Sequence, residues 1–448
     1  MRIAIVCNDT RGGIQPYVAL ALGLRAAGHD VRAIAPADLA PMFSARGLET
    51  APLSGSIEEI MRGSGGVTEK GMLASIRFAA REMPRRLGQW TREALDACQG
   101  VELITGGIGG MVVALSVAEK VGVPFVEAHL QPVGAPSRDY PGVLMPGIPA
   151  WLGSAGRRLS HALTQELLWG PFRGAMARAR HDVLGLRGRP SSSAGQPVLY
   201  AFSRHVVPVP PSARQERHVT GYWSLTAPAD SSLPGELEAF LDLGGPVVSI
   251  GFGSMATQDP RAVTELVLGA VRDAGVRAVS LSGWGGLERT GAPELFPISS
   301  VPHDQLFPRV AAVVHHGGAG TTAAGLRAGV PSVVIPFTMD QPFWASRVAA
   351  LGVGPAPIPR SRLTRGRLAN AIRQAVDDAP MAARAATLGA RIRAEDGVAE
   401  AIKHLECGFR TIVNSGVGIV NSQIGIVNTW IGIVNRWSGH REQAILPR

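Results

Sequence analysis

The chain has 448 residues, of which 46% are hydrophobic and 18% charged, so the sequence predicts a large folded core and excludes a chain that is disordered throughout. Its net charge of +9 comes from 44 Lys and Arg against 35 Asp and Glu, and the basic residues are scattered, which favours a solvated basic surface over a nucleic-acid-binding patch. The three cysteines, Cys7, Cys98 and Cys407, are far apart and odd in number, so they predict neither a disulfide framework nor a CxxC metal site and fit a reducing setting.

No segment of the sequence predicts export or a membrane span. The apolar run that follows Arg2 has only five residues, which is too short for the core of a signal peptide. No stretch reaches the roughly 18 consecutive apolar residues that a transmembrane helix needs. We therefore expect a cytoplasmic protein without an integral membrane segment.

The first half of the chain alternates buried strands with helices. Its opening predicts a strand over residues 3–7, a polar, glycine-rich loop over 8–15, and a helix that has Pro16 in its first turn and ends near Gly28. Further strands are predicted at 30–36, 101–105, 123–130 and 197–202, with an alanine-rich helix that ends at Val121 and a mostly helical stretch over 151–186. Strand–helix–strand units at this spacing predict a parallel sheet.

A second alternating region follows a linker. Residues 224–236 are rich in Ser, Pro and Ala and lack periodicity, which is typical of a linker. Beyond it, the sequence predicts strands within 246–254, 276–283, 311–316 and 331–337, and helices at 260–274 and 340–352. The predicted fold class is therefore α/β, with two Rossmann-like doubly wound domains that bind ligands at the carboxyl ends of their strands.

The C-terminal tail differs from the rest of the chain. From residue 415 it reads SGVGIVN, SQIGIVN and TWIGIVN, a glycine-spaced repeat of seven residues that is nearly uncharged. The repeat lacks the e and g charges of a coiled coil, so we expect residues 407–448 to form a loosely ordered appendage. The alternative is a segment that makes peripheral contact with a membrane, although the tail lacks the cationic face that such segments use.

The strongest chemical motif is HHGGAGTT at residues 315–322, which ends a predicted strand and opens a helix. Its glycines allow backbone N–H groups to approach an anion, and the helix N-terminus adds partial positive charge. His316 can donate to a phosphate oxygen, so the motif predicts a diphosphate-binding site. It lacks the ending of a Walker A loop and the GxGxxG spacing. The alternative is an ordinary tight turn between a strand and a helix.

Three other motifs follow strands of the second region. Ser254, in GFGSM, can hydrogen-bond the same diphosphate, or the motif is only a packing turn. Asp340 and Gln341, in MDQP, supply an acceptor pair and an amide that suit the adjacent hydroxyls of a sugar. The alternative role of Asp340 is to cap the following helix. Trp284, in SGWGG, either flanks a nucleobase or packs in the core.

Together these motifs resemble those of the GT-B nucleotide-sugar glycosyltransferases, in the branch that contains sterol glucosyltransferases and the antibiotic-tailoring glycosyltransferases of actinobacteria. The matching stretches are TRGGIQPYVALALGL, HVVPVPP, HVTGYW, GFGSM, SGWGGL, VPHDQLFPRV, HHGGAGTTAAGLRAGVPSVVIPF and DQPFWASRV. The resemblance covers residues 1–406. It implies an N-terminal acceptor-binding domain at 1–223, a C-terminal donor domain at 237–380, and a C-terminal helix at 381–406 that crosses back.

The resemblance further implies an inverting transfer of a hexose, usually glucose from UDP-glucose, to a hydroxyl of a lipophilic molecule such as a sterol, a terpenoid or a polyketide. The nucleotide sugar is the co-substrate, and neither a metal nor another cofactor is expected. The residues implied at the diphosphate are Ser254, His316, Gly318, Gly320 and Thr321. Those implied at the sugar hydroxyls are Asp340 and Gln341, and those near the uracil are Trp284 and Val301.

The sequence departs from the family pattern at the catalytic base. Family members commonly have an Asp after Arg-Gly in the first loop, and the residue here is Gly13. Direct displacement at the anomeric carbon needs a group that takes the acceptor proton. The candidates are Asp9, in the same loop, and His129, at the end of a predicted strand. Their alternative roles are an Asx turn for Asp9 and a core or acceptor-wall position for His129.

Two other functions are compatible with parts of the sequence. Gly13 also suits an auxiliary protein of the same fold that binds a nucleotide sugar but lacks a competent base. The sequence also departs from the family pattern at Gln305, Thr338 and Met339, three residues of the predicted donor domain. A dinucleotide-dependent oxidoreductase is disfavoured, because GxGxxG and a ribose-binding acidic residue are absent after the first strand.

Overall fold

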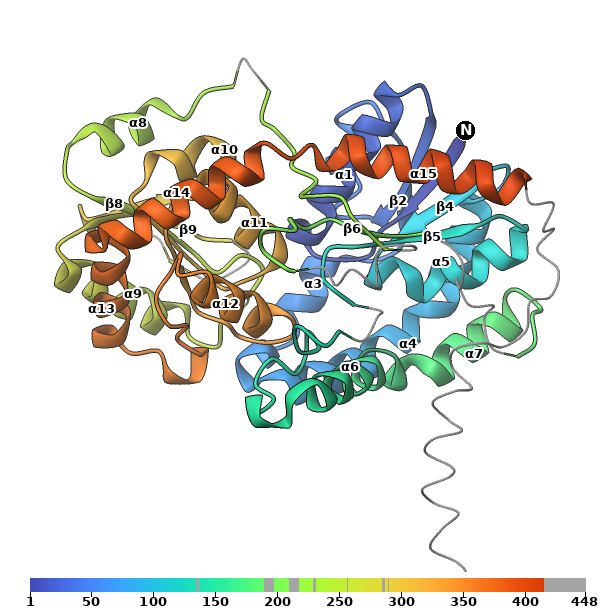
Figure 1. The fold of residues 1–448 in the computed structure, drawn as a ribbon, viewed down its shortest axis with the longest axis horizontal. Helices are drawn as coiled ribbons and strands as arrows, with labels where there is room; N and C mark the ends of the chain where they lie inside the picture. Colours follow the sequence, from blue (N-terminus) through green and yellow to red (C-terminus); the bar gives the residue numbers. More distant parts are fainter. Residues whose placement is uncertain are drawn as a thin grey trace, which may run out of the picture.

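The computed structural model describes residues 1–133, 137–188, 197–208, 217–228, 231–255, 257–283, 287–288 and 290–414. It contains two parallel sheets, and Figure 1 shows them side by side in two α/β domains. The seven-stranded sheet has the order β3-β2-β1-β4-β5-β6-β7, and the five-stranded sheet has the order β10-β9-β8-β11-β12. Both orders reverse at the first strand of their domain, as in doubly wound folds. The predicted fold class is confirmed.

The N-terminal domain places helices around its sheet. The strands are β1 (Arg2–Val6), β2 (Asp30–Pro36), β3 (Glu49–Leu53), β4 (Leu103–Gly106), β5 (Phe125–His129), β6 (Val198–Tyr200) and β7 (Arg217–Val219). The helices are α1 (Arg11–Ala26), α2 (Pro41–Ser44), α3 (Ile57–Arg62), α4 (Met72–Ala97), α5 (Ile108–Val121), α6 (Gly153–Trp169) and α7 (Arg173–Asp182). Helix α4 is the longest helix among the described residues, and neither this helix nor β3 was predicted from the sequence.

The C-terminal domain also alternates strands with helices. Its first helix, α8 (Gly235–Asp242), begins inside the linker that was predicted at 224–236. Its strands are β8 (Val247–Gly251), β9 (Arg277–Leu281), β10 (Leu295–Ile298), β11 (Ala312–His315) and β12 (Ser332–Val334). Its other helices are α9 (Pro260–Ala274), α10 (His303–Leu306), α11 (Ala319–Ala328), α12 (Gln341–Ala350), α13 (Arg365–Asp377), α14 (Ala379–Arg393) and α15 (Gly397–Asn414). Short 3-10 helices lie at Val67–Lys70, Ala150–Leu152, Gly170–Phe172, Phe307–Arg309 and Arg360–Arg362.

Helix α1 begins at Arg11, well before Pro16, so the predicted start of this helix is wrong. Thr10 is extended, and its carbonyl oxygen accepts from the N–H groups of the first helical turn, so the polar loop after β1 is short. Pro16 therefore lies inside the helix, where it lacks the N–H that would donate to the carbonyl of Gly12. The predicted end is correct, because Gly28 follows the helix with a left-handed φ of 84°.

The C-terminal segment crosses back as two helices, where a single helix was predicted. Helix α14 packs on the C-terminal domain, and α15 packs against α1 of the N-terminal domain (Figure 1). Ala401 and Leu405 of α15 are fully buried in the N-terminal core. Glu406 pairs with His29 at 3.0 Å, and α15 continues to Asn414, past the predicted boundary at residue 406. The heptad repeat from residue 415 lies outside the described residues.

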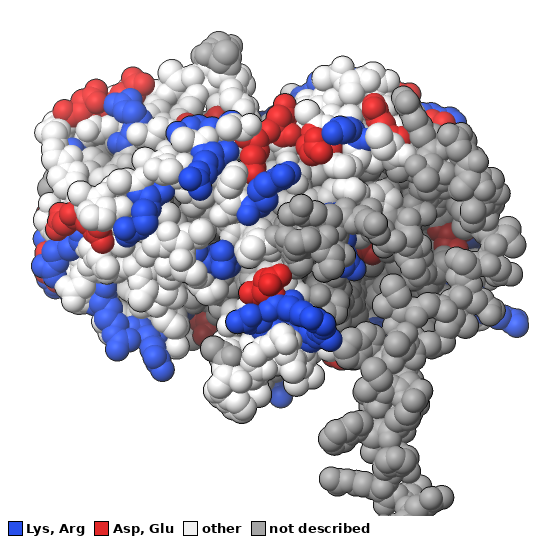
Figure 2. Space-filling view, viewed as in Figure 1, with Lys and Arg blue, Asp and Glu red and all other residues white. Residues whose placement is uncertain are grey.

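The surface carries mixed charge. Over the described residues of the face in Figure 2, arginines and lysines alternate with acidic and uncharged side chains. Within the same described part of the chain, no helix is both long enough and apolar enough to cross a membrane.

Candidate active site

A cavity of about 770 Å³ lies between the two domains, at the carboxyl ends of strands from both sheets. It brings together nearly all the residues that the sequence predicts for a site, although their positions are spread over more than 300 residues of the chain. These are Asp9, Ser254, Val301, His316, Gly318, Gly320, Thr321, Asp340 and Gln341. Trp284 lies outside the described residues.

One end of the cavity is formed by the turn from β11 into α11. Gly317 has a φ of 88°, a conformation that glycine adopts without strain. Gly318 then occupies the N-cap position of α11, and no side chain caps the helix. The first N–H groups of a helix lack partners within it and attract anions. This end of the cavity is therefore built to accept negative charge.

The His316 ring lies in a narrow space between two glycines. A Cβ at Gly253 would lie 2.8 Å from its Cε1 atom, and a Cβ at Gly318 would lie 2.5 Å from its Nε2 atom. Burial, followed by the charge of His303, lowers the pKa of His316 to about 4, so the ring is neutral at pH 7. Its Nδ1 atom has no hydrogen-bond partner among the described residues. A neutral, fixed imidazole beside a helix N-terminus can donate one hydrogen bond to a phosphate oxygen.

His315 shapes the same turn. Its Nδ1 atom accepts a hydrogen bond from the backbone N–H of Gly317 at 3.1 Å. Burial, followed by His316 and His303, lowers the pKa of His315 to about 3. A neutral His315 is required for its Nδ1 atom to accept this bond, so the ring holds the glycine turn in place.

Asp340 occupies the N-cap position before α12 and lines the cavity, but its side chain does not cap the helix. Its Oδ2 atom accepts from the indole N–H of Trp344 at 2.9 Å and from the side-chain amide of Gln131 at 3.1 Å. The capping alternative is therefore wrong. Gln131 belongs to the N-terminal domain, so this carboxylate joins the two domains. Burial raises the pKa of Asp340.

Gln341 supports the loop that precedes α12. Its Oε1 atom accepts from the backbone N–H groups of Phe337 at 2.8 Å and Thr338 at 3.1 Å. Within that loop Met339 has a φ of 56°, which is unusual for a residue other than glycine. The side-chain amide therefore holds a strained turn, a role that the sequence analysis did not identify.

Asp9 lies on the N-terminal side of the cavity, where its carboxyl group fills the space beside Gly13. A Cβ at Gly13 would lie 2.2 Å from Asp9 Cγ. The Asp9 Oδ1 atom accepts from the backbone N–H of the next residue, Thr10, at 2.6 Å, whereas an Asx turn would use the N–H of Arg11, two residues on. Burial raises the pKa of Asp9 to about 6; the Thr10 N–H opposes this shift and the charge of Asp340 adds to it. Asp9 and Asp340 thus face one another across the domain boundary.

The second base candidate lies elsewhere. His129 is buried at the end of β5 and is not among the residues that line the cavity. Its Nε2 atom is 2.7 Å from the Glu127 carboxylate. The structure therefore places His129 in the core, which was the alternative to a catalytic role.

Two of the residues that depart from the family pattern in the donor domain, Gln305 and Thr338, form hydrogen bonds with other parts of the protein. The Gln305 amide donates to the carbonyl oxygen of Ser231 at 2.8 Å and to its hydroxyl at 2.7 Å, and Gln305 does not line the cavity. The Thr338 hydroxyl donates to the Ser75 hydroxyl at 3.1 Å and so connects the two domains.

The other end of the cavity is a largely apolar space in the N-terminal domain, which we call the acceptor chamber. Its apolar walls come from the segments around α2 to α6 and are formed by Met42, Ile57, Ile60, Met61, Phe78, Met83, Trp90, Val112, Leu130, Val143, Leu144, Leu168, Trp169 and Phe172. These residues were not predicted from the sequence, because they lie on separate elements and share no motif. Among the described residues, no group of three or more His, Cys, Asp or Glu side chains could hold a metal ion.

Comparisons with known proteins find relatives that match most of the chain. The family described as erythromycin biosynthesis protein CIII-like, C-terminal domain, matches residues 291–407. A sterol 3-beta-glucosyltransferase of Arabidopsis thaliana is 35% identical over 423 residues, which are 90% of this chain and 65% of the plant protein. The sterol 3-beta-glucosyltransferase of Aspergillus clavatus is 34% identical over 424 residues, again 90% of this chain but 29% of the fungal protein. The chain thus spans less than a third of the fungal relative and about two thirds of the plant relative.

Solved structures share the fold at lower identity. The glycotransferase of kitacinnamycin superposes with a TM-score of 0.66 at 20% identity and covers 91% of this chain and 99% of its own. The glycosyltransferase SnogD from Streptomyces nogalater superposes with a TM-score of 0.63, also at 20% identity and the same coverage. SsfS6 from Streptomyces sp. SF2575, solved with thymidine diphosphate, has a TM-score of 0.61 at 21% identity and covers 91% of this chain and 99% of its own.

Proposed function

This chain is a GT-B-fold homologue of the sterol 3-beta-glucosyltransferases, and from that premise we propose that it transfers a hexose, with inversion, from a nucleotide sugar to a hydroxyl of a lipophilic small molecule. The proposed donor is UDP-glucose. The proposed acceptor class is a sterol, terpenoid or polyketide. The proposal needs no cofactor besides the nucleotide sugar.

The donor diphosphate is proposed to bind at the N-terminus of α11. Ser254 and His316 supply side-chain donors there, and the uncapped N–H groups of the helix supply the rest. Negative charge grows on the diphosphate as the bond to the sugar breaks. Donors fixed in advance around that charge lower the barrier, because they need not reorganise during the reaction.

The sugar is proposed to lie between Asp340 and the N-terminal domain. The Oδ2 atom of Asp340 is held by Gln131 and Trp344, and neither of these two bonds uses its Oδ1 atom. Oδ1 is therefore available to a sugar hydroxyl. Gln341 supports this position by fixing the loop before α12, and its side chain also lines the cavity.

The observation that carries the proposal is the position of the Asp9 carboxyl. The space for a side chain at residue 13 is where the resembling family places its base, and the Asp9 carboxyl fills that space from four residues earlier. A Cβ at Gly320 of α11 would lie only 2.7 Å from the carbonyl oxygen of Gly12, in the first turn of α1, so the segment that follows Asp9 lies close to the proposed diphosphate site.

Asp9 is proposed to be the general base. A carboxylate whose pKa is raised to about 6 is mostly ionised at pH 7 and more basic than an exposed carboxylate. The acceptor hydroxyl gives its proton to Asp9 while its oxygen attacks the anomeric carbon. The bond from that carbon to the diphosphate oxygen breaks on the opposite face, and UDP leaves with the electron pair.

A second candidate function is an auxiliary protein that binds the nucleotide sugar without turning it over. Gly13 is the observation that favours it, because the residue expected as the base is absent. The two candidates differ in one measurable property. A transferase slowly releases sugar from its donor to water, whereas an auxiliary protein binds UDP and leaves the donor intact.

The test is a matrix of nucleotide sugars against hydroxylated lipophilic acceptors, in which products are scored by a mass increase of one hexose. The proposal expects glycosylated product with UDP-glucose and at least one acceptor, together with slow hydrolysis of the donor alone. UDP binding without hydrolysis or transfer from any donor would contradict it and support the auxiliary protein.

A further inference from the structure

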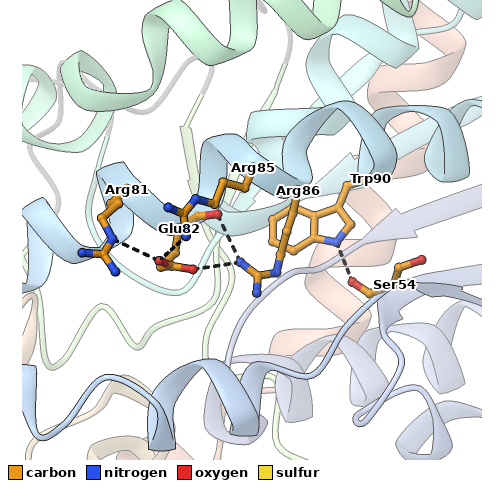
Figure 3. Close-up of polar contacts among 6 residues, drawn as sticks. All are labelled: Ser54, Arg81, Glu82, Arg85, Arg86 and Trp90. Carbon is orange, nitrogen blue, oxygen red and sulfur yellow. Dashed lines mark hydrogen bonds and ion pairs between the residues drawn. The ribbon is translucent and has the colours of Figure 1, made fainter.

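The acceptor chamber contains a charged group that the proposed reaction does not use. Glu82 and Arg86 lie one turn apart on α4, and both line the cavity among apolar residues. Figure 3 shows Glu82, Arg86 and Trp90 projecting from the same side of α4, with the Trp90 indole donating to the carbonyl oxygen of Ser54 at 2.8 Å. A charged side chain is costly to place in an apolar wall, so this one needs an explanation.

Glu82 is surrounded by three arginines. Its Oε1 atom is 3.3 Å from Arg81 Nε and 3.1 Å from Arg85 Nη1, and its Oε2 atom is 3.2 Å from Arg86 Nη1 (Figure 3). The hydrogen bond from Arg86, followed by the other arginines, holds the pKa of Glu82 below its ordinary value. Three positive charges against one negative charge leave this cluster with a net charge of +2.

Arg86 differs from the other two arginines in its surroundings. The side chains of Arg81 and Arg85 are 73% and 62% exposed, and neither lines the cavity. The side chain of Arg86 is 34% exposed and lines the chamber. Because Arg81 and Arg85 already form ion pairs with the Glu82 carboxylate, Arg86 is not needed to neutralise the charge of Glu82.

The guanidinium of Arg86 is fixed on one side and free on the other. Its Nη1 atom donates to the Glu82 carboxylate and to the Glu82 carbonyl oxygen, each at 3.2 Å. Its Nε and Nη2 atoms have no hydrogen-bond partner among the described residues. The N–H groups of these two atoms point in parallel from one edge of the guanidinium plane, and this pair matches the two oxygens of a carboxylate.

From this geometry we propose that Arg86 binds a carboxylate on the acceptor. The acceptor is then an amphipathic hydroxy acid. Its apolar body fills the acceptor chamber, its hydroxyl reaches Asp9, and its carboxylate pairs with the Nε and Nη2 atoms of Arg86. Glu82 is a positioning residue that holds the guanidinium in place. The inference rests on the proposed function and narrows its acceptor class from any hydroxylated lipophilic molecule to one that carries a carboxylate.

The test compares matched acceptors that differ only in charge. A hydroxylated steroid or terpenoid with a side-chain carboxylate is assayed against its methyl ester, with UDP-glucose as donor. We expect kcat/KM for the acid to exceed that for the ester by at least about tenfold, because a charge-assisted bidentate bond is made only by the acid. The difference should lie mainly in KM, since the interaction is the same in the ground state and in the transition state.

Single substitutions distinguish the role of Arg86 from that of the neighbouring arginines. Arg86→Ala should lower kcat/KM for the acid by about tenfold to a hundredfold and leave the ester within about twofold. Arg86→Lys should restore only part of the preference, since lysine keeps the charge and lacks the fork. Arg81→Ala is the matched control, because Arg81 contacts the same Glu82 carboxylate and does not line the cavity.

The outcomes are distinguishable. Equal kcat/KM for acid and ester in the natural protein, unchanged by Arg86→Ala, would overturn the inference while the proposed function stands. Loss of the preference for the acid in Arg81→Ala, or in a variant of Arg11 or Arg46, which also line the cavity, would overturn the assignment to Arg86. Absence of transfer to every acceptor, neutral or anionic, would instead be a failure of the proposed function.

Discussion

The carboxyl group of Asp9 occupies the space that a side chain at Gly13 would need: a Cβ at Gly13 would lie 2.2, 2.4 and 2.7 Å from the Cγ, Oδ2 and Oδ1 atoms of Asp9. Gly13 is therefore a requirement for the position of Asp9 as well as a departure from the family pattern. The two residues act as a pair, in which the absence of one side chain permits the other to reach the cavity.

This pairing predicts that Gly13→Ala lowers activity by displacing the Asp9 carboxyl. We expect a loss of about a hundredfold in kcat, since misplacing a reacting group by about 1 Å costs that much. Gly12→Ala is the matched control, because no atom of the described residues beyond its chain neighbours and its own helix backbone lies within 4 Å of a Cβ at that position, and both residues lie in the first turn of α1. Steady-state kinetics of both variants measure the difference. Equal rates for the two would show that the position of Asp9 is unimportant.

His316 should be essential for the use of the donor. Loss of a hydrogen bond to developing charge costs about 2–4 kcal/mol, so His316→Ala should lower kcat about a hundredfold or more at saturating donor. Gly318→Ala should have a smaller effect in the same direction, because its Cβ would lie 2.5 Å from His316 Nε2. His181→Ala, at an exposed position on α7, is the control. Near-normal turnover of His316→Ala at saturating donor would contradict the assignment to the diphosphate.

Asp340 should set the choice of sugar. An acceptor atom matched to a hydroxyl rejects donors that lack the hydroxyl, because it is then left unpaired. Asp340→Ala should lower both the rate with UDP-glucose and the preference for glucose over a deoxy-sugar donor. Gln131→Ala should weaken the preference to a lesser degree, since it removes one of the two bonds that orient Asp340. Competition between the two donors measures the ratio; a wild-type ratio in Asp340→Ala would restrict this residue to joining the domains.

A half-buried histidine should make the stability pH-dependent. His218 of β7 stacks on His404 of α15 at 3.6 Å between ring centroids, with Glu400 nearby. Burial, followed by the charge of His404, lowers the pKa of His218 to about 4. As pH falls below 6.5, the unfolded chain binds a proton that the folded chain does not, so the free energy of unfolding falls between pH 6.5 and 4.

The variant His218→Phe keeps the stacking and removes this titration. Between pH 6.5 and 4, the free energy of unfolding of this variant should fall by about 1–2 kcal/mol less than that of the natural protein. This value is reduced for the partial exposure of the ring. Urea unfolding at several pH values measures the slope. A slope unchanged from the natural protein would show that His218 is not a source of the pH dependence.

Helices and strands could be predicted from the sequence where the element buries one face along its whole length. The strand at Asp30–Pro36 and the helix at Pro260–Ala274 match their predicted bounds, because their apolar spacing and their glycine or proline ends are local properties. Helix α4 was missed because its buried residues, Leu87, Trp90, Thr91 and Ala94, all lie in its second half. Its first half lines a cavity and contains Pro84 and several charges, so it lacks the apolar period of a buried helix.

The site was predictable where the sequence places polar groups directly after strands. The predicted cluster that includes Ser254, His316 and Asp340 lines one cavity, since parallel strands bring their carboxyl ends together. The interactions of Asp340 with Gln131, and of Asp9 with the space at Gly13, depend on how loops and domains pack. Such packing leaves no periodic signal in the sequence, and the same is true of the acceptor chamber.

The most direct test of the central claim, that Asp9 is the base of a glycosyl transfer, is the pH dependence of kcat/KM for the natural protein and for Asp9→Asn. Burial raises the pKa of Asp9 to about 6, and the base acts only when ionised, so the rate of the natural protein should rise with pH and level off above an apparent pKa near 6. Asp9→Asn should be slower by about a hundredfold or more and should lose this rise, because an amide takes no proton. An Asp9→Asn variant that keeps the natural rate and the natural pH profile would contradict the account.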